Sequence, residues 1–207
     1  MEKFVHLTAK ACPLLLPSLN TDQILPARYL KWPRSKGLGT VLFEDLRKDD
    51  KGNPRADFPL NQSAYSDAKI ILAGRNFGGG SSREAAVYAV YDHGIRCVIA
   101  PSFGDIFAQN AVKNGLLTAI MPEEEIAKIA AVLAANPEQA VSVDLEQQTI
   151  RCSDQRCTFT IDPVSRNQLL NGWDDVDLTE SYRANIAAFK ARDKQNRPWA
   201  TPTTAQA

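Results

Sequence analysis

The residues with the clearest capacity for chemistry lie in the run Asn76-Phe-Gly-Gly-Gly-Ser-Ser-Arg-Glu84. Its three glycines let a ligand approach the backbone closely, and the guanidinium of Arg83 can donate paired hydrogen bonds to a carboxylate or a phosphate. The run lies between a strand-like and a helix-like segment, and a helix N-terminus offers unpaired N–H groups and a partial positive charge. The pattern therefore predicts an anion-binding site that contains a candidate nucleophile or base.

A purely structural role is the main alternative for this run. Ser81 and Glu84 fit the S-x-x-E capping box, in which Ser caps the helix and Glu reaches back. Two nucleotide-binding motifs fit poorly: Arg83 stands where a dinucleotide fingerprint needs its third Gly, and no Gly-Lys-Ser/Thr follows as in a P-loop. A simple cap needs neither the second Ser nor the Arg, so their conjunction favours a functional site.

The elements that must position this run alternate between strand and helix. Such alternation predicts two βαβ units, with strands at 69–74, 96–100 and 117–121 and helices at 82–93 and 104–114. A helix is expected at 123–135, antiparallel strands near 141–145, 148–152 and 157–161, and a last helix over about 178–192. Residues 1–45 suggest strands and loops, and 47–66 suggest an exposed loop. We expect one α/β domain over 1–192, with a parallel βαβ core and added antiparallel strands, and a disordered tail at 193–207.

Composition excludes several classes of function. The 207 residues include 24 basic and 24 acidic ones with no Lys/Arg block, which argues against nucleic-acid and membrane-surface roles. Apolar stretches are only strand-length, and the N-terminus lacks signal-peptide features, so we expect a soluble cytoplasmic protein. Four cysteines without CxxC pairs indicate free thiols in a reducing compartment. With two histidines, they do not make a convincing ligand set, so we expect no metal on this chain.

Three motifs occur in order along the chain: Asn20-Thr-Asp-Gln-Ile-Leu-Pro-Ala-Arg-Tyr-Leu30, Gly78-Gly-Gly-Ser-Ser-Arg-Glu84 and Ala100-Pro-Ser-Phe-Gly-Asp-Ile-Phe107. Together they resemble the small-subunit family of 3-isopropylmalate dehydratase, the swivelling domain of the aconitase superfamily. The similarity extends from about residue 4 to about residue 190. It implies a single swivelling domain with β/β/α layers.

The resemblance also implies a hydro-lyase made of two chains, which isomerises 2-isopropylmalate and 3-isopropylmalate by dehydration and rehydration in leucine biosynthesis. A large partner subunit, in a heterodimer or heterotetramer, would hold a [4Fe–4S] cluster that binds the small branched hydroxy-diacid substrate. This chain would close over the cluster and supply the base, which the family places on Ser81. A neutral Ser is a weak base, so helix N–H groups and Arg83 would stabilise its alkoxide, while Ser82 and Arg83 bind a substrate carboxylate.

The first motif lies at the mouth of the active site in this family. Thr21 and Asp22 would line that mouth, although they also fit an Asx-type turn, and Arg28 would bind substrate unless it is a solvated loop residue. The residue after Tyr-Leu senses the group that differs between substrates, and here it is Lys31. Its stem can pack on apolar surface while its head stays in water, so it does not decide between substrates.

Two positions depart from the commonest family text, Gly-Cys-Gly-Ser-Ser-Arg-Glu-His-Ala. Gly79 replaces the Cys and Ala85 replaces the His. Neither is expected to be the base, so the expected reaction type is unchanged. Both could alter the volume or polarity of the pocket, so the sequence does not identify the substrate. The alternatives are a sister hydratase acting on citraconate, a dimethylmaleate-like acid or another small diacid, and a non-enzymatic domain that binds an anion.

Overall fold

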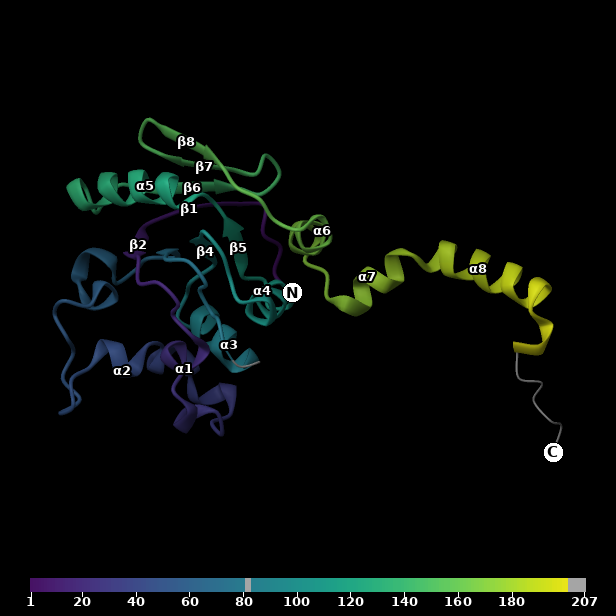
Figure 1. The fold of residues 1–207 in the computed structure, drawn as a ribbon, viewed down its shortest axis with the longest axis horizontal. Helices are drawn as coiled ribbons and strands as arrows, with labels where there is room; N and C mark the ends of the chain where they lie inside the picture. Colours follow the sequence, from purple (N-terminus) through teal and green to yellow (C-terminus); the bar gives the residue numbers. More distant parts are fainter. Residues whose placement is uncertain (81–82, 201–207) are drawn as a thin grey trace.

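The computed structural model describes residues 1–80 and 83–200. Over these residues the strands form two four-stranded sheets. One is parallel in the order β2-β3-β4-β5, and the other is antiparallel in the order β1-β6-β7-β8. Figure 1 shows both sheets in one body, from which the last helices extend as an arm.

The parallel sheet is the centre of the molecule. Its strands are β2 (Ala11–Leu14), β3 (Ile70–Ala73), β4 (Cys97–Ala100) and β5 (Leu117–Ile120). Side chains alternate between its two faces, so Ile71 and Ala73 join one apolar core while Ile70 and Leu72 join the other. Burial on both faces explains why these segments are almost continuously apolar.

Helices cover one face of the parallel sheet, and the antiparallel sheet and a long helix cover the other. The first face carries α1 (Thr21–Ile24), α3 (Glu84–Asp92) and part of α4 (Asp105–Lys113). The second carries α5 (Glu123–Ala135) and the sheet of β1 (His6–Ala9), β6 (Val141–Asp144), β7 (Thr149–Cys152) and β8 (Gln155–Thr158). The predicted mixed fold, with a parallel βαβ core and added antiparallel strands, is confirmed.

The segment between β2 and β3 is more ordered than its composition suggests. It contains α2 (Glu44–Arg47) and short 3-10 turns at 27–29, 34–36, 38–41, 59–61 and 63–65. Phe58, Leu60 and Tyr65 are buried in the first core, so the prediction of an exposed loop over 47–66 is wrong for its second half.

The C-terminal part differs most from expectation. A helix that the sequence pattern did not suggest, α6 (Pro163–Asn171), begins with Asp162 as its N-cap and Pro163 in its first turn. The expected last helix is divided at Tyr182 into α7 (Asp175–Ser181) and α8 (Arg183–Asn196), followed by a 3-10 turn at Pro198–Ala200. The boundary drawn at residue 193 thus falls inside a helix, and residues 201–207 lie outside the described part. Within the described residues, none of the helices combines the length and apolar character that crossing a membrane requires.

Candidate active site

The glycine-rich loop continues the parallel sheet beyond the ends of its strands. Phe77 pairs with Phe103 on one side, and Gly79 pairs with Asn20 on the other. Hydrogen bonds fix both edges: the N–H of Gly78 donates to Leu19 O at 2.7 Å, and the N–H of Asn76 donates to Ser102 Oγ at 2.9 Å. The three motifs found in the sequence therefore meet at the carboxyl edge of the sheet, where ligands bind in open α/β folds.

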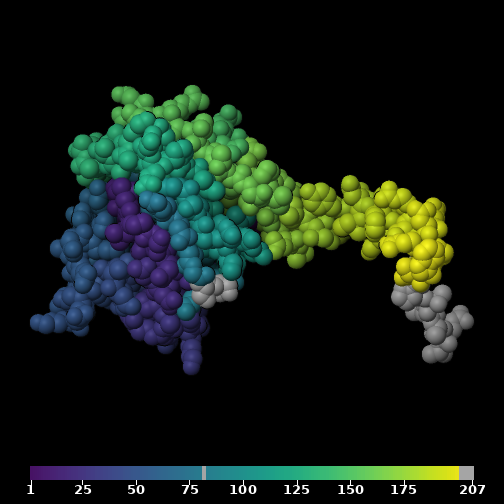
Figure 2. Space-filling model, viewed as in Figure 1, coloured from purple at the N-terminus to yellow at the C-terminus, as the bar shows by residue number. Residues whose placement is uncertain are grey.

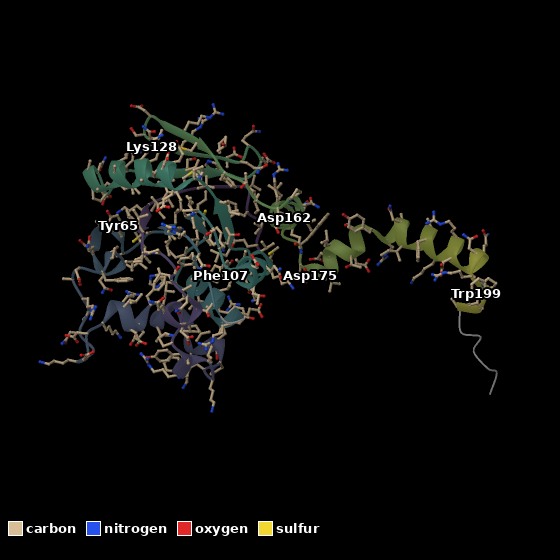
Figure 3. The ribbon with its side chains drawn as sticks, in the orientation of Figure 1. Tyr65, Phe107, Lys128, Asp162, Asp175 and Trp199 are labelled. Atoms are coloured by element: carbon tan, nitrogen blue, oxygen red, sulfur yellow. The ribbon has the colours of Figure 1, made fainter. Side chains whose placement is uncertain are left out.

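Gly78 shows why this loop needs glycine. Its φ of +73° lies in the left-handed region, and a Cβ there would lie 2.3 Å from Cγ of Phe107. Phe107 of α4, labelled in Figure 3, is buried. Its ring centroid lies 5.3 Å from that of Phe77. The loop can therefore rest on this aromatic pair only without a side chain at position 78.

Gly79, where the family text has Cys, lies beside Asn76. A Cβ at Gly79 would come within 2.8 Å of the Asn76 side-chain amide, which occupies that space here. Asn76 itself has a φ of +57°, a conformation that Asn tolerates better than most residues. Ala85, the second departure, is half-buried against the first core.

Arg83 and Asp22 form an ion pair across the loop. Arg83 is the N-cap of α3 with an extended backbone, and Asp22 lies in the first turn of α1. That turn is fixed by a capping box between Asn20 and Gln23 and by the N–H of Thr21, which donates to Gly79 O at 3.0 Å. The Asp22 side chain is 54% exposed and that of Arg83 is 21% exposed, so this charged pair faces an open surface.

Ser81 and Ser82 lie outside the described residues, so the structure does not test their assigned roles. The helix start bears on the alternative role of Ser81. Because Arg83 is the N-cap and Glu84 the first helical residue, the S-x-x-E capping box is not the cap of this helix. Glu84 instead accepts a hydrogen bond from Nδ2 of Asn114, at the end of α4, at 3.0 Å.

Arg28 pairs with a different carboxylate from the one that Arg83 contacts. Its guanidinium donates to both carboxylate oxygens of Asp45, at 3.0 and 2.5 Å, and lies 4.7 Å from the ring centroid of Tyr29. These hydrogen bonds raise the pKa of Arg28 and lower that of Asp45. Lys31 is exposed, and its role and that of Arg28 in substrate binding stay predictions.

The segment that carries Arg28 and Lys31 is attached to α3 by Arg34. Arg34 donates through Nε and Nη2 to the carboxylate of Asp92, at 2.9 and 2.6 Å, and lies 4.4 Å from the Tyr88 ring centroid. His93 holds the adjacent turn, with its Nδ1 2.9 Å from Gly39 O, and burial lowers its pKa. His93 thus makes a structural contact at the end of α3.

The cysteines are poor candidates for metal ligands. All four are buried and free, and burial raises the pKa of Cys12 to about 12 and that of Cys157 to about 11. Metals bind thiolates, and these thiols hold their protons. Among the described residues, no group of three or more His, Cys, Asp or Glu side chains is placed to hold a metal ion.

Comparisons with known proteins agree with this architecture. The family model described as Aconitase C-terminal domain matches residues 1–124, and a second model, LeuD_N, matches residues 127–163. The 3-isopropylmalate dehydratase small subunit of Rhodospirillum centenum is 49% identical over 201 residues, which cover 97% of this chain and 99% of the relative. The chain belongs to the family of 3-isopropylmalate dehydratase small subunits.

Further members agree in sequence and in structure. The small subunit of Dinoroseobacter shibae is 46% identical over 200 residues, which cover 96% of this chain and all of that protein. A crystal structure of 3-isopropylmalate dehydratase from Methanocaldococcus jannaschii superposes with a TM-score of 0.64 at 27% identity, covering 89% of this chain and 99% of that one. The family resemblance found in the three motifs is therefore confirmed.

Several residues that build this site were not found from the sequence. The Asn20–Gln23 capping box had a readable signal, Asn-x-x-Gln before an apolar run. No signal in the sequence indicated the three ion pairs, because charged residues far apart in the chain form no local pattern. These pairs are Asp22–Arg83, Arg28–Asp45 and Arg34–Asp92.

Proposed function

We propose that the chain is the small subunit of a two-subunit 3-isopropylmalate dehydratase, which interconverts 2-isopropylmalate and 3-isopropylmalate by dehydration and rehydration in leucine biosynthesis. The observation that carries the proposal is 49% identity with a small subunit of that name across almost the full length of both chains. The free cysteines favour a reducing compartment, and we place the protein in the cytoplasm.

The partner in this proposal is a large subunit that carries a [4Fe–4S] cluster. Such a cluster needs thiolate ligands, and the buried, protonated cysteines described above are unsuited to that task. When bound to substrate, the cluster would supply a Lewis-acidic iron for the hydroxyl and a carboxylate. The open surface around Arg83 and Asp22 is consistent with a site that another chain completes.

In this proposal Ser81 takes the proton from the carbon beside a substrate carboxylate, and its alkoxide is stabilised by the N-terminus of α3 and by Arg83. Ser82 and Arg83 bind a carboxylate, which the guanidinium fork suits. Asp22 and Thr21 hold the opposite side of the loop. Arg28 and Lys31 lie on the segment that would contact the variable group of the substrate.

A sister hydratase is the second candidate, and a specific feature favours it. Gly79 and Ala85 are both smaller than the residues of the commonest family text, and the Asn76 amide lies beside Gly79. The loop surface therefore differs in polarity close to the proposed base. Citraconate or a dimethylmaleate-like acid would be the substrate class in that case.

Reconstitution tests these proposals. The chain is mixed with the large subunit from the same organism, its cluster is reconstituted, and hydration of a panel of alkene diacids is followed in the ultraviolet. We expect the highest kcat/KM with the isopropylmalate-derived alkene and rescue of a leucine auxotroph that lacks its own small subunit. A preference for citraconate or dimethylmaleate without rescue would establish the sister hydratase. Absence of both pairing and hydratase activity would leave an anion-binding domain.

A further inference from the structure

We propose that residues Asp175–Ala200, here called the C-terminal arm, are a docking element that binds the large subunit. This inference rests on the proposed function, because it needs a large subunit to exist. Figure 2 shows the arm, in yellow-green and yellow, projecting from the body of the molecule. The main contacts of α8 are with α7 and the 3-10 turn at Pro198–Ala200, its neighbours in the chain.

The root of the arm is fixed to the body. The carboxylate of Asp175 pairs with Lys113 of α4 at 2.8 Å and accepts from Nε2 of the buried Gln168 at 3.1 Å. The hydrogen bond between Asp175 and Lys113 raises the pKa of the amine and lowers that of the carboxyl. Asp174 caps the start of α7 in a capping box with Asp177. The arm therefore leaves the body from an anchored point (Figure 3).

Beyond that root, the arm presents apolar side chains to solvent. Tyr182, Ile186 and Phe189 follow one another at spacings of four and three residues, which places them on one face of the helix, and they are 53%, 36% and 52% exposed. Trp199, at the outer end in Figure 3, is 79% exposed. A helix of this length is marginal in water alone, and helices in proteins gain most of their stability by packing an apolar face. Packing of this apolar face against a partner surface would therefore stabilise α8.

The comparisons favour the large subunit as the partner of the arm. The two family models end at residues 124 and 163, before the arm begins. The match to the Rhodospirillum centenum small subunit leaves out only six of the 207 residues, so it includes most of the arm. By its name, the aconitase domain is the C-terminal part of a longer chain, so covalent connection keeps it near the rest of that enzyme. A separate small subunit lacks that connection and must supply contact area, which the arm offers.

Charge favours a different chain over a second copy. From Arg183 to Arg197 the arm has five Lys or Arg residues and one Asp, while the whole chain is balanced. Arg183 pairs with Glu180 and Arg197 pairs with Asp193, so the positive charges that α8 presents are those of Lys190, Arg192 and Lys194. Two such helices, laid side by side, would repel each other. The surface that fits the arm is an apolar groove with a carboxylate rim.

The test compares two double variants of the full chain. Ile186→Asp with Phe189→Asp places charges on the apolar face. Ala188→Asp with Ala191→Asp places the same charges at the same spacing on the opposite face and serves as the matched control. Affinity for the cluster-loaded large subunit is measured by sedimentation, together with activity as a function of large-subunit concentration.

We expect the first variant to raise the Kd about tenfold to a hundredfold and the control to change it less than about threefold. Because the glycine-rich loop is untouched, kcat at saturating large subunit should match that of the unaltered chain. Equal binding by both variants would overturn the docking role while leaving the proposed function intact. Dimerisation of the isolated chain that only the first variant abolishes would assign the arm to a second copy and overturn the proposal. If the unaltered chain binds no large subunit, the proposed function falls, and the arm's role falls with it.

Discussion

The guanidinium of Arg83 is held by the carboxylate of Asp22, which lies 61 residues earlier in the chain. This pair joins the first turn of α1 to the N-cap of α3 across the glycine-rich loop. Exposed ion pairs contribute little to stability, so its main effect is to fix the direction of the guanidinium. A preorganised Arg83 would lose less conformational freedom when it binds a carboxylate.

Replacing Asp22 by Asn tests this positioning. We expect Asp22→Asn to raise KM about threefold to tenfold with kcat nearly unchanged, because ordering a freed side chain costs about 1 kcal/mol. The matched control is Asp67→Asn, which removes another exposed partner, that of Lys10, just before β3. Steady-state kinetics with the reconstituted enzyme measures both. A lower KM in Asp22→Asn would show instead that Asp22 competes with the substrate for Arg83.

The assigned base gives a second prediction. Ser81→Ala should lower kcat about a thousandfold, within the range for loss of a general base, while the complex with the large subunit forms as before. Exchange of the substrate C–H proton with deuterated water, followed by NMR, should be lost in parallel. Ser82→Ala is the comparison, and it should act mainly on KM. Retained turnover in Ser81→Ala would remove Ser81 from the mechanism.

A comparison of Gly52 with Gly78 distinguishes the cost of backbone strain from the cost of a steric clash. Gly78 and Gly52 both have positive φ, at +73° and +82°, but a Cβ at Gly78 would strike Phe107, while Gly52 has open space around it. We expect Gly52→Ala to cost about 1 kcal/mol of the free energy of unfolding and Gly78→Ala about 3 kcal/mol. Urea unfolding measures both. Equal costs would mean that Phe107 moves aside without penalty.

The sequence predicted the regular elements well where an apolar pattern and a stop signal coincide. The helix at 123–135 is observed with the same limits, because three acidic residues open it and one side is apolar throughout. The buried strands β3 and β4 fall within one residue of their predicted limits, since short apolar runs between turn residues have few alternatives.

Local signals were weaker where tertiary contacts decide the structure. Ser81 looked like the cap of α3, yet the helix begins at Glu84, whose carboxylate contacts Asn114. Arg28 pairs with Asp45, a contact that the sequence did not indicate, and its role in substrate binding stays a prediction. Both outcomes depend on residues 17 to 30 positions away, and no periodic pattern records such contacts. The same holds for Asp22 and Arg83.

Arg34 gives a prediction about the loop at 28–37. Its fork with Asp92 ties that loop to the end of α3. Arg34→Ala should make the amide protons of this loop exchange with deuterium about threefold to tenfold faster, because local opening loses an ion pair and a ring contact. Lys31→Ala removes an exposed cation from the same loop and should leave the exchange unchanged. Equal exchange in both variants would show that the Gly39–His93 contact suffices to hold the loop.

Cys12 leads to a prediction about alkaline stability. Burial raises the pKa of its thiol to about 12, whereas an unfolded chain has a thiol pKa of about 8.5. Below about pH 8.5 both states hold the proton, so the contribution of Cys12 to stability is fully present; as the pH rises towards 12, the unfolded state ionises first and that contribution is lost. In urea unfolding, the advantage of the unaltered chain over Cys12→Ala should therefore shrink by about 2 kcal/mol between pH of about 8.5 and about 10. Titrations of other groups occur in both proteins and cancel in this difference. If the difference between the two proteins did not change with pH, the native Cys12 thiol would ionise as readily as the unfolded one. The charge of Arg47, which lowers the pKa of Cys12, would then offset the effect of burial.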